Sequence, residues 1–587
     1  MASETPMSAL RLDLIARYLG PHRREVALGV VALVLVNLLS TAFPLLVRRI
    51  IESLKDGFSQ QELLVEAALI LALATVMGLV RLASRVLVFG IGRQVEADLK
   101  QRIFDHVLRQ EPSFVQGMGS GEVISRATSD VENVRRLLGF ALLSLANTAL
   151  AYAMTLPAML LINPGLSLAA VGLYPLMLMT VRLFGGRMMR QQRRLQESLA
   201  SLSDLIQEDI SGIGAIKIYG QEATEQKAFA GRNRAYRDAA LGLARSRSTL
   251  FPLLEGISSI SLLLLLALGS GQLERGSLSI GDLVALVLFV ERLVFPTALL
   301  GFTLNTFQTG QVSLERVEAL LNRRSLITSP AKPQRAPEPA QGSVQAVGLT
   351  VRYPDAQRPA LDNLHFTLAP GELVAVVGPV GCGKTTLARA LGRLVQVPEG
   401  QLFFDGVDIT ALDLGSLRSR VALVPQEGYL FTCSLADNLR YGAPDASQER
   451  VERAAREARL ESDIRSFPDG YDTLVGERGI TLSGGQRQRT ALGRALLVDA
   501  PLLVLDDALA SVDNNTAAAI LRSVREQERR TVLMISHQLS AAAACDRILV
   551  MEEGRLVQQG HHRDLVAVAG PYRRLWEREQ AERLEPV

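Results

Sequence analysis

Long runs of apolar residues fill the first half of the chain and stop near its middle. Six runs stand out, over residues 24–47, 63–89, 139–162, 165–184, 249–271 and 278–303. A helix needs about 20 apolar residues to cross the hydrocarbon core of a bilayer, and most of the runs meet that length. No comparable run follows residue 320. The pattern therefore predicts six membrane-spanning helices, followed by a half of the chain that lies outside the membrane.

The pattern changes after a Pro-rich stretch at residues 330–342. Beyond it, short apolar strands such as Leu373–Val377 and Leu502–Leu505 alternate with helical stretches. This alternation is typical of an α/β domain with a largely parallel core sheet. We therefore expect a membrane α-helical bundle fused to an α/β domain. The predicted boundaries are residues 1–320 for the transmembrane domain, 321–342 for the linker and 343–587 for the α/β domain.

Basic residues indicate which polar segments stay on the cytoplasmic side. Residues 90–138 carry 7 Lys or Arg residues and residues 185–248 carry 11, whereas the opposite connections are short and carry far fewer. Since cytoplasmic loops are enriched in Lys and Arg, both termini are predicted to be cytoplasmic. Both basic segments look helical, with turn-like breaks at 112–121 and 212–220. We therefore expect two helical hairpins below the membrane, whose tips touch a cytosolic domain.

Composition excludes several classes of protein. The 587 residues are 48% hydrophobic and 21% charged, which is too apolar for an ordinary soluble protein of this size. The formal net charge is +3, so a nucleic-acid binder that relies on overall basicity is disfavoured. The spacing of Cys382, Cys433 and Cys545 suits neither a zinc site nor a disulfide framework.

A phosphate-binding motif follows the apolar strand at Leu373–Val377. Residues Gly378–Thr385 read GPVGCGKT, the spacing of a P-loop between a strand and a helix. In such a loop the glycines let backbone N–H groups surround phosphate oxygens. Lys384 places a positive charge near the β and γ phosphates, and Thr385 offers a hydroxyl to Mg²⁺. The motif indicates that the α/β domain binds a nucleotide.

Two further motifs narrow the kind of nucleotide-binding domain. The apolar strand Leu502–Leu505 runs into Asp506, and P-loop ATPases hold Mg²⁺ with a carboxylate placed in this way. The segment Leu482–Gln486 reads LSGGQ and opens a helix about 100 residues after the P-loop. Its glycines after a serine predict a second anion-binding nest of backbone N–H groups.

With these motifs in this order, the chain resembles the ATP-binding cassette (ABC) exporters over essentially its full length. Within them it is most similar to the bacterial multidrug-exporter half-transporters that pair as heterodimers. The resemblance implies ATP and Mg²⁺ as cofactors, ATP hydrolysis coupled to export of amphipathic drugs or lipids, and a location in the bacterial cytoplasmic membrane. It also implies a second half-transporter, because the nest of one chain completes the ATP site of the other. No nucleic acid is expected.

The resemblance assigns roles to residues that would carry little weight alone. Tyr353 matches the aromatic residue that stacks on adenine, and Gln426 matches the glutamine that senses Mg²⁺ and the attacking water. Val475–Gly479 resembles the exporter stretch that touches the cytoplasmic helix tips. Asp513 matches the aspartate of the loop that crosses the dimer seam, and His537 matches the histidine that contacts the γ phosphate.

Together these matches define the expected site. The residues expected to bind the nucleotide are Tyr353, Gly378, Gly381, Gly383, Lys384, Thr385, Thr386, Ser483, Gly484, Gly485, Gln486 and Asp513. Those expected to hold Mg²⁺ are Thr385, Gln426 and Asp506, and those expected to act in catalysis are Asp507, His537 and Gln426.

Asp507 departs from the pattern, since the family places a glutamate there to orient the attacking water. Its carboxylate lies one methylene back, roughly 1.5 Å, and a misplacement near 1 Å can cost on the order of a hundredfold in rate. Two interpretations follow: the aspartate works adequately, or this P-loop belongs to a slow, degenerate site. With an intact LSGGQ segment, the second is the family's mark of a heterodimer. Cys382 and Gln538 also depart from the usual residues, with no predicted consequence.

Competing functions differ in what the ATP drives. The main alternative to export is an ABC membrane protein that uses nucleotide to gate a channel. A soluble ABC ATPase acting on DNA or ribosomes is excluded by the six spans. Inside the membrane, Glu291 and Arg292 either line a substrate cavity or pair with another span, and Arg81 and Arg85 lie close enough to the inner ends of their span to snorkel.

Overall fold

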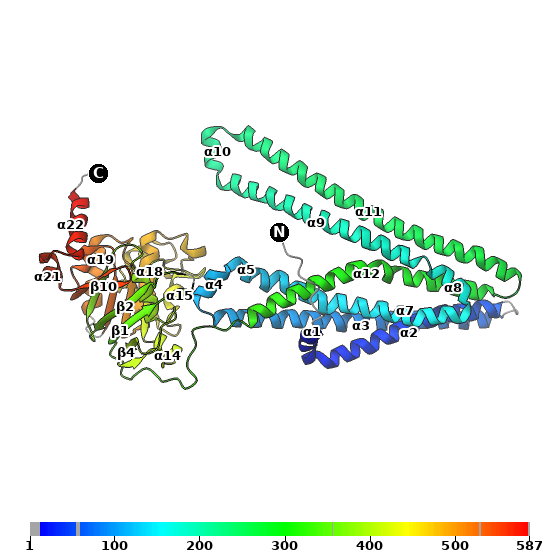
Figure 1. Cartoon of the computed structure of the whole chain (residues 1–587), viewed down its shortest axis with the longest axis horizontal. Coiled ribbons are helices and arrows are strands. Elements are labelled where there is room, and N and C mark those ends of the chain that lie inside the picture. The colour runs from blue at the N-terminus through cyan, green and yellow to red at the C-terminus, as the bar shows by residue number, and fades with distance from the viewer. Residues whose placement is uncertain (1–11, 55–58, 355, 527–529, 585–587) are drawn as a thin grey trace. The chain divides into compact units, whose positions relative to one another are not determined.

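The computed structural model describes residues 12–54, 59–354, 356–526 and 530–584 (Figure 1). They form two compact units, each described here by itself. The first unit contains the chain up to Leu108 together with Ser120–Arg323. The second contains Arg109–Gly119 together with the chain from Arg324 onward. One of the two expected hairpin tips therefore belongs to the same unit as the α/β domain.

The first unit has helices and no strands among its described residues. Its elements are α1 (Leu12–Leu19), η1 (Gly20–His22), α2 (Arg23–Ser53), α3 (Gln60–Leu108), α5 (Ser120–Ser125), η3 (Arg126–Asp130), α6 (Val131–Arg136), η4 (Leu137–Ala141), α7 (Leu142–Ile162), α8 (Pro164–Val171), α9 (Tyr174–Ser211), α10 (Ile213–Tyr219), α11 (Glu222–Glu274) and α12 (Ile280–Leu321). Within the described residues, six helical stretches are long and apolar enough to cross a membrane, which confirms the prediction of six spans.

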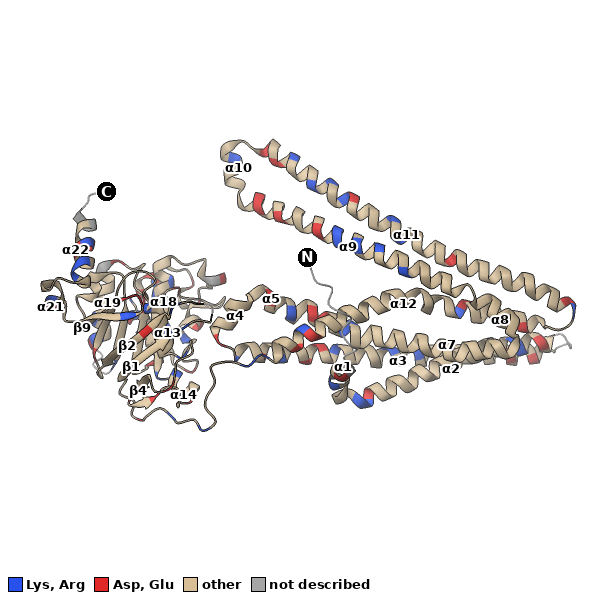
Figure 2. Ribbon diagram, in the orientation of Figure 1, with Lys and Arg blue, Asp and Glu red and all other residues tan. Residues whose placement is uncertain are grey.

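The spanning helices continue far beyond the length that a bilayer needs. α3 has 49 residues and α11 has 53, against about 20 for a span. Figure 2 shows charged residues gathered along the halves of α9 and α11 that lead to α10, with few along their other halves. α9, α10 and α11 thus form a helical hairpin whose polar half projects out of the apolar region, as expected.

The fourth span differs from the continuous helix that its apolar run predicts. α8 ends at Val171 and α9 begins at Tyr174, with the break at Gly172 and Leu173. Pro175 stands in the first turn of α9. Because proline has no N–H to donate to the preceding turn, it is tolerated at a helix start and interrupts a helix that would run through it.

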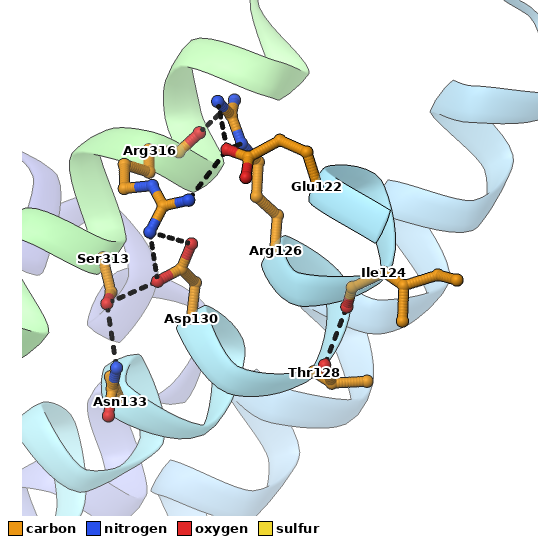
Figure 3. A network of polar contacts seen from close by, with 8 residues as sticks. All are labelled: Glu122, Ile124, Arg126, Thr128, Asp130, Asn133, Ser313 and Arg316. Atoms are coloured by element: carbon orange, nitrogen blue, oxygen red, sulfur yellow. Dashed lines mark hydrogen bonds and ion pairs between the residues drawn. The ribbon is translucent and has the colours of Figure 1, made fainter. Parts of the chain in front are cut away.

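A polar network joins the start of the third span to the end of the sixth (Figure 3). The Arg316 guanidinium on α12 pairs with Glu122 at 2.8 Å and with Asp130 at 3.3 Å. The Ser313 hydroxyl donates to the buried Asp130 carboxylate at 2.8 Å. Asp130 ends the π-helical turn η3, a local widening of the helix that often marks functional positions. The network fixes α5 and η3 against α12.

The second unit contains two sheets and one short helix from the first half of the chain. Its strands are β1 (Val344–Val351), β2 (Leu361–Leu368), β3 (Leu373–Val377), β4 (Leu402–Phe404), β5 (Val407–Asp408), β6 (Val421–Val424), β7 (Leu502–Asp506), β8 (Thr531–Ile535), β9 (Arg547–Glu552) and β10 (Arg555–Gly560). Its helices are α4 (Pro112–Met118), α13 (Lys384–Leu391), α14 (Leu414–Arg418), α15 (Leu435–Arg440), α16 (Gln448–Glu457), α17 (Glu461–Ser466), η5 (Gly470–Asp472), η6 (Glu477–Gly479), α18 (Gly484–Val498), α19 (Asn514–Glu526), α20 (Leu539–Ala542), α21 (His562–Ala567) and α22 (Pro571–Leu584).

The six-stranded sheet has the order β10-β9-β3-β8-β7-β6, and all its pairings except β9 with β10 are parallel. This confirms the predicted parallel core sheet. Strands β3, β7 and β8 are buried at every residue, as expected for parallel strands covered on both faces. A second, antiparallel sheet of order β2-β1-β4-β5 was not predicted. Its strands β4 and β5 have only three and two residues, too few to show a period in the sequence.

The predicted linker is bound to the α/β domain by hydrogen bonds and an ion pair. The Gln334 N–H donates to the Ala411 carbonyl, and the Ala336 N–H donates to the Ser416 hydroxyl, both at 2.9 Å. Glu338 pairs with Arg420 at 2.6 Å. Pro337, between these positions, stiffens the segment but leaves the neighbouring N–H groups available, so the linker adds to the domain.

Candidate nucleotide-binding site

The P-loop folds as the motif predicts, between β3 and α13. Gly383 caps α13 with φ of 103°, a backbone conformation that side chains disfavour. A Cβ on Gly383 would lie 2.3 Å from the Ala360 carbonyl oxygen, so only glycine fits. Gly381 has φ of 82°. These turns bring the loop to the N-terminus of a helix, where backbone N–H groups bind anions.

Lys384 is buried and folded back along the loop. Its Nζ donates to the carbonyl oxygens of Gly378 at 2.8 Å and Pro379 at 2.9 Å. The Cys382 sulfur lies 3.7 Å from the same Nζ, and burial raises the pKa of the Cys382 thiol. The cysteine therefore stays a neutral, small side chain beside the lysine, and the loop tolerates it in place of serine.

Thr385 and Asp506 meet across the sheet edge. The Thr385 hydroxyl donates to the Asp506 carboxylate at 3.1 Å. Burial raises the pKa of Asp506; the hydrogen bond from Thr385 partly opposes this, and the neighbouring charge of Asp507 adds to it. A hydroxyl and a carboxylate are the hard oxygen ligands that Mg²⁺ takes when it also binds phosphates. Among the described residues, no group of three or more His, Cys, Asp or Glu side chains is placed to hold a metal ion.

Asp507 occupies a turn that most residues avoid. Its φ is 50°, its N–H donates to the Ile535 carbonyl at 2.9 Å, and it is buried beside Asp506. Aspartate is one of the few residues that visit this left-handed region readily. Asp507 thus lies in a tight turn directly after β7. Its side chain has one methylene fewer than glutamate, so its carboxylate lies nearer to the backbone than a glutamate carboxylate can.

Tyr353 and Thr386 extend the site on the other side of the P-loop. The Tyr353 hydroxyl lies 3.3 Å from the Thr386 hydroxyl at the start of α13. Tyr353 follows β1, so the second sheet supplies the aromatic ring. This places an aromatic face near the phosphate loop, as the resemblance implied for the adenine-stacking residue.

Gln426 and His537 lie at the same edge of the sheet as the P-loop. Gln426 follows the carboxyl end of β6 and His537 follows that of β8, and both side chains are exposed. Neither forms a hydrogen bond within the described part of the chain. In parallel α/β sheets, ligands bind outside the carboxyl ends of the strands, so both side chains lie where a ligand of this sheet would bind.

The LSGGQ segment forms a separate helix N-terminus. Ser483 caps α18: its hydroxyl accepts from the Gln486 N–H at 3.3 Å, while the Gln486 side chain accepts from the Ser483 N–H at 2.9 Å. Gln486 also donates to Asp463. A Cβ on Gly485 would lie 2.9 Å from the Ser511 carbonyl oxygen.

The LSGGQ segment packs against the loop that carries Ser511 and Asp513. Gly484 lies within van der Waals reach of Ser511, two residues before Asp513. Asp513 accepts from the Thr516 N–H at 3.0 Å, and the hydrogen bonds from Thr516 lower its pKa. The Ser511 N–H also donates to the Gln488 side chain of α18 at 2.8 Å, so this loop is joined to the helix that the segment opens.

One functional contact was missed by the sequence reasoning. The buried Glu111 carboxylate, just before α4, accepts from the Ser325 hydroxyl at 2.7 Å and from the Leu326 N–H at 3.2 Å. Phe114 of α4 is also buried. The sequence marked this segment as a turn, but a lone glutamate before a proline gives no sign of its partner more than 200 residues away.

Comparisons with known proteins agree with this geometry. Residues 26–297 match the ABC transporter transmembrane region family, and residues 361–510 match the ABC transporter family. The chain is 32% identical over 559 residues to the multidrug resistance-like ATP-binding protein MdlA of Escherichia coli K12, covering 94% of each chain. It is also 32% identical over 565 residues to the ATP-dependent lipid A-core flippase of Thiobacillus denitrificans, covering 95% of this chain and 96% of the flippase.

A solved structure agrees as well. The structure of a bacterial Atm1-family ABC exporter with ATP bound superimposes with a TM-score of 0.78 at 29% identity, covering 95% of this chain and 98% of that one. The relatives match over nearly the full length of the chain, which has six spans and an ATPase domain with a P-loop. The chain therefore belongs to the ABC exporters, ATP-hydrolysing membrane transporters.

Proposed function

We propose that this chain is one half of an exporter that moves amphipathic small molecules, drugs or lipids, out of the cytoplasm or the inner leaflet. The observation that carries the proposal is the joining of α4 to the ATPase domain in one compact unit through Glu111. α4 is covalently continuous with α3 and α5, so movement of the ATPase domain is passed to helices of the membrane bundle. The relatives named for multidrug resistance and lipid flipping support this substrate range.

In this mechanism each residue of the nucleotide-binding site has its own role. The P-loop N–H groups and Lys384 bind the β and γ phosphates, and Tyr353 stacks on the base. Thr385 and Asp506 would hold Mg²⁺, which when bound neutralises charge between the phosphates. Asp507 would orient the attacking water, with Gln426 and His537 near the γ phosphate.

A second half-transporter completes the active complex in this proposal. The tip of the α9–α11 hairpin exposes Ile210, Ile213, Ile218 and Tyr219, with Ile218 at 80% exposed. Large apolar side chains at a polar hairpin end are costly in water and mark a protein interaction site. The separate helix N-terminus at Ser483 also supports a second chain, because it would meet the phosphates of a partner's P-loop.

The partner is proposed to be a different chain. Asp507, with its shortened reach, supports a slow ATP site at this chain's P-loop, whereas the intact Ser483–Gln486 segment supports a fast site built with the partner. We place the complex in the bacterial cytoplasmic membrane with both termini cytoplasmic. The Lys- and Arg-rich segments 90–138 and 185–248 support this orientation.

The test is transport in inverted membrane vesicles that contain the complex with its copurifying partner. We expect fluorescent amphipaths to accumulate inside the vesicles with Mg²⁺-ATP, and Lys384→Ala to reduce accumulation strongly. Arg193→Ala is the matched control, because Arg193 is 82% exposed on α9 and far from the site in sequence. Passive ion flux opened by ATP, without accumulation of any amphipath, would instead establish the nucleotide-gated channel.

A further inference from the structure

The membrane unit contains a cavity of about 470 Å³ among α2, α3, η4, α7 and α12. Part of its wall is apolar and aromatic, with Phe89, Phe140, Phe295 and Leu299. Arginine, asparagine, serine and threonine side chains also line it, beside further apolar residues. A lining with both kinds of side chain suits a molecule that has both characters.

Three arginines line the cavity. Arg81 and Arg85 lie four residues apart on one face of α3, and Arg292 projects from α12. No Asp or Glu lines the cavity, and none of the three arginines has a carboxylate partner within the part of the chain that the structure describes. The snorkelling expected for Arg81 and Arg85 is therefore an incomplete account, since both face a shared space with Arg292.

Arg292 is held in place by neutral groups only. Its guanidinium donates to the Thr41 hydroxyl at 2.6 Å and to the carbonyl and side-chain oxygens of Asn37 at 3.0 Å each. Asn37 is only 3% exposed, and its amide donates to Asn147 on α7 at 3.1 Å. These hydrogen bonds from α2 and α7 orient Arg292 without neutralising its charge.

Glu291 does not supply the missing negative charge. It neighbours Arg292 in sequence, but it is exposed on α12 and does not line the cavity. Arg292 both lines the cavity and forms hydrogen bonds with another span, α2, whereas Glu291 forms no ion pair with the described residues.

Arginines without carboxylate partners inside the membrane favour binding of an anion. Arg292 lies 12 residues into α12, roughly 18 Å along the helix axis, within the stretch that crosses the membrane. Ionisable groups there are costly unless paired or hydrated, and they mark substrate or ion pathways. A cationic guest would meet three like charges, whereas an anionic guest would form charge-assisted hydrogen bonds to guanidinium groups.

We propose that the cavity binds an amphipathic anion, with a phosphate or carboxylate headgroup against Arg81, Arg85 and Arg292 and its apolar tail against Phe140 and Phe295. The inference rests on the proposed export function for its meaning, since it names the substrate class of that transporter. Binding itself does not depend on transport. A lipid headgroup and a free amphipathic anion offer the same chemistry, and the experiment separates them.

The experiment measures binding of fluorescent probes to the purified complex in a neutral detergent without ATP. The probes are a tail-labelled phosphatidylglycerol, a tail-labelled phosphatidylcholine, a labelled dodecyl phosphate and a labelled dodecyl trimethylammonium. We expect the two anionic probes to bind more tightly than the zwitterionic and cationic ones. Removing one guanidinium by Arg292→Gln or Arg85→Gln should weaken anion binding by about tenfold, the scale of a charge-assisted hydrogen bond.

Two variants keep the result interpretable. Arg85 forms no side-chain hydrogen bond with the described residues, so Arg85→Gln tests the charge even if Arg292→Gln disturbs the fold. Arg193→Gln, on the exposed part of α9, should leave anion binding unchanged. Tight binding of phosphatidylglycerol alone identifies a lipid substrate, and equal binding of dodecyl phosphate identifies a free anion.

Failure of the inference is distinct from failure of the proposed function. Cationic or neutral probes that bind as tightly as the anions, or anion binding unaffected by Arg85→Gln, would overturn the inference even if ATP-driven transport occurs. Selective, arginine-dependent anion binding without any ATP-driven transport would support the inference and overturn export.

Discussion

The carboxylate of Glu111 accepts a hydrogen bond of 2.7 Å from the hydroxyl of Ser325. Glu111 lies between α3 and α4, and Ser325 follows α12. Because the Leu326 N–H also donates to Glu111, the carboxylate ties α4 to the start of the linker. We interpret this tie as the mechanical link between the ATPase domain and two spanning helices.

Loss of this tie should uncouple transport from hydrolysis. We expect Glu111→Ala to keep ATPase activity within about twofold while transport per ATP hydrolysed falls about fivefold or more, the range of typical coupling free energies. Glu111→Gln retains one acceptor oxygen and should be milder. Parallel ATPase and vesicle-uptake measurements decide the matter, and an equal loss of both activities would assign Glu111 to folding or to the site itself.

The two ATP sites of the complex should differ in their response to mutation. Ser483→Ala, or more strongly Gly484→Asp, should cripple steady-state ATPase, because a carboxylate at that helix N-terminus repels phosphate. Asp507→Asn should be much milder, since it alters a site that is already slow. Complete loss of turnover on Asp507→Asn would show a working catalytic aspartate and would favour a symmetric homodimer.

Nucleotide binding that depends on Mg²⁺ should be lost on acidification at a higher pH than an ordinary aspartate predicts. The raised pKa of Asp506 keeps its carboxyl protonated, and therefore a poor Mg²⁺ ligand, to higher pH. Asp507→Asn removes a nearby negative charge and should move the midpoint to lower pH. A fluorescent ATP analogue titrated from about pH 8 to 4 measures both midpoints, with Mg²⁺-free binding as the control. Identical midpoints would show that Asp507 does not act on Asp506.

The network around Asp130 should contribute to the stability of the membrane unit. Arg316→Ala removes the ion-pair partner of a buried carboxylate, at a cost of about 1–3 kcal/mol given the partial exposure of the arginine. The detergent-solubilised complex should melt earlier. Asp130→Asn in the same chain should restore part of the loss, because no uncompensated charge remains, whereas Arg193→Ala should change nothing. A double variant no more stable than Arg316→Ala would mean that the ion pair contributes little.

Much of the fold could be predicted because its signals are local. The apolar runs predicted the spans, and the spacing of the glycines predicted the P-loop at Gly378–Thr385. Contacts between distant segments were missed, since nothing near Glu111 marks Ser325 and nothing near Arg81 marks Arg292. The break at Gly172 and Leu173 was also missed, although Pro175 signalled it. The hydrogen bonds of the Pro-rich linker were not predicted either, because composition does not show which N–H groups find acceptors.

Because α4 and the ATPase domain belong to one unit but lie far apart in the sequence, their association during synthesis is delayed. A ribosome finishes Gly119 long before it reaches Arg324, and it needs several hundred further residues before the sheet around β7 is complete. At 5–20 residues per second, this delay is on the order of tens of seconds. Phe114 is buried in the finished protein. During that interval most of the unit to which it belongs has not been synthesised, so the nascent chain passes through a stage in which this unit is incomplete. Truncated translation products that stop short of β7 should therefore be targets for chaperones and proteases, even when all six spans are already in the membrane.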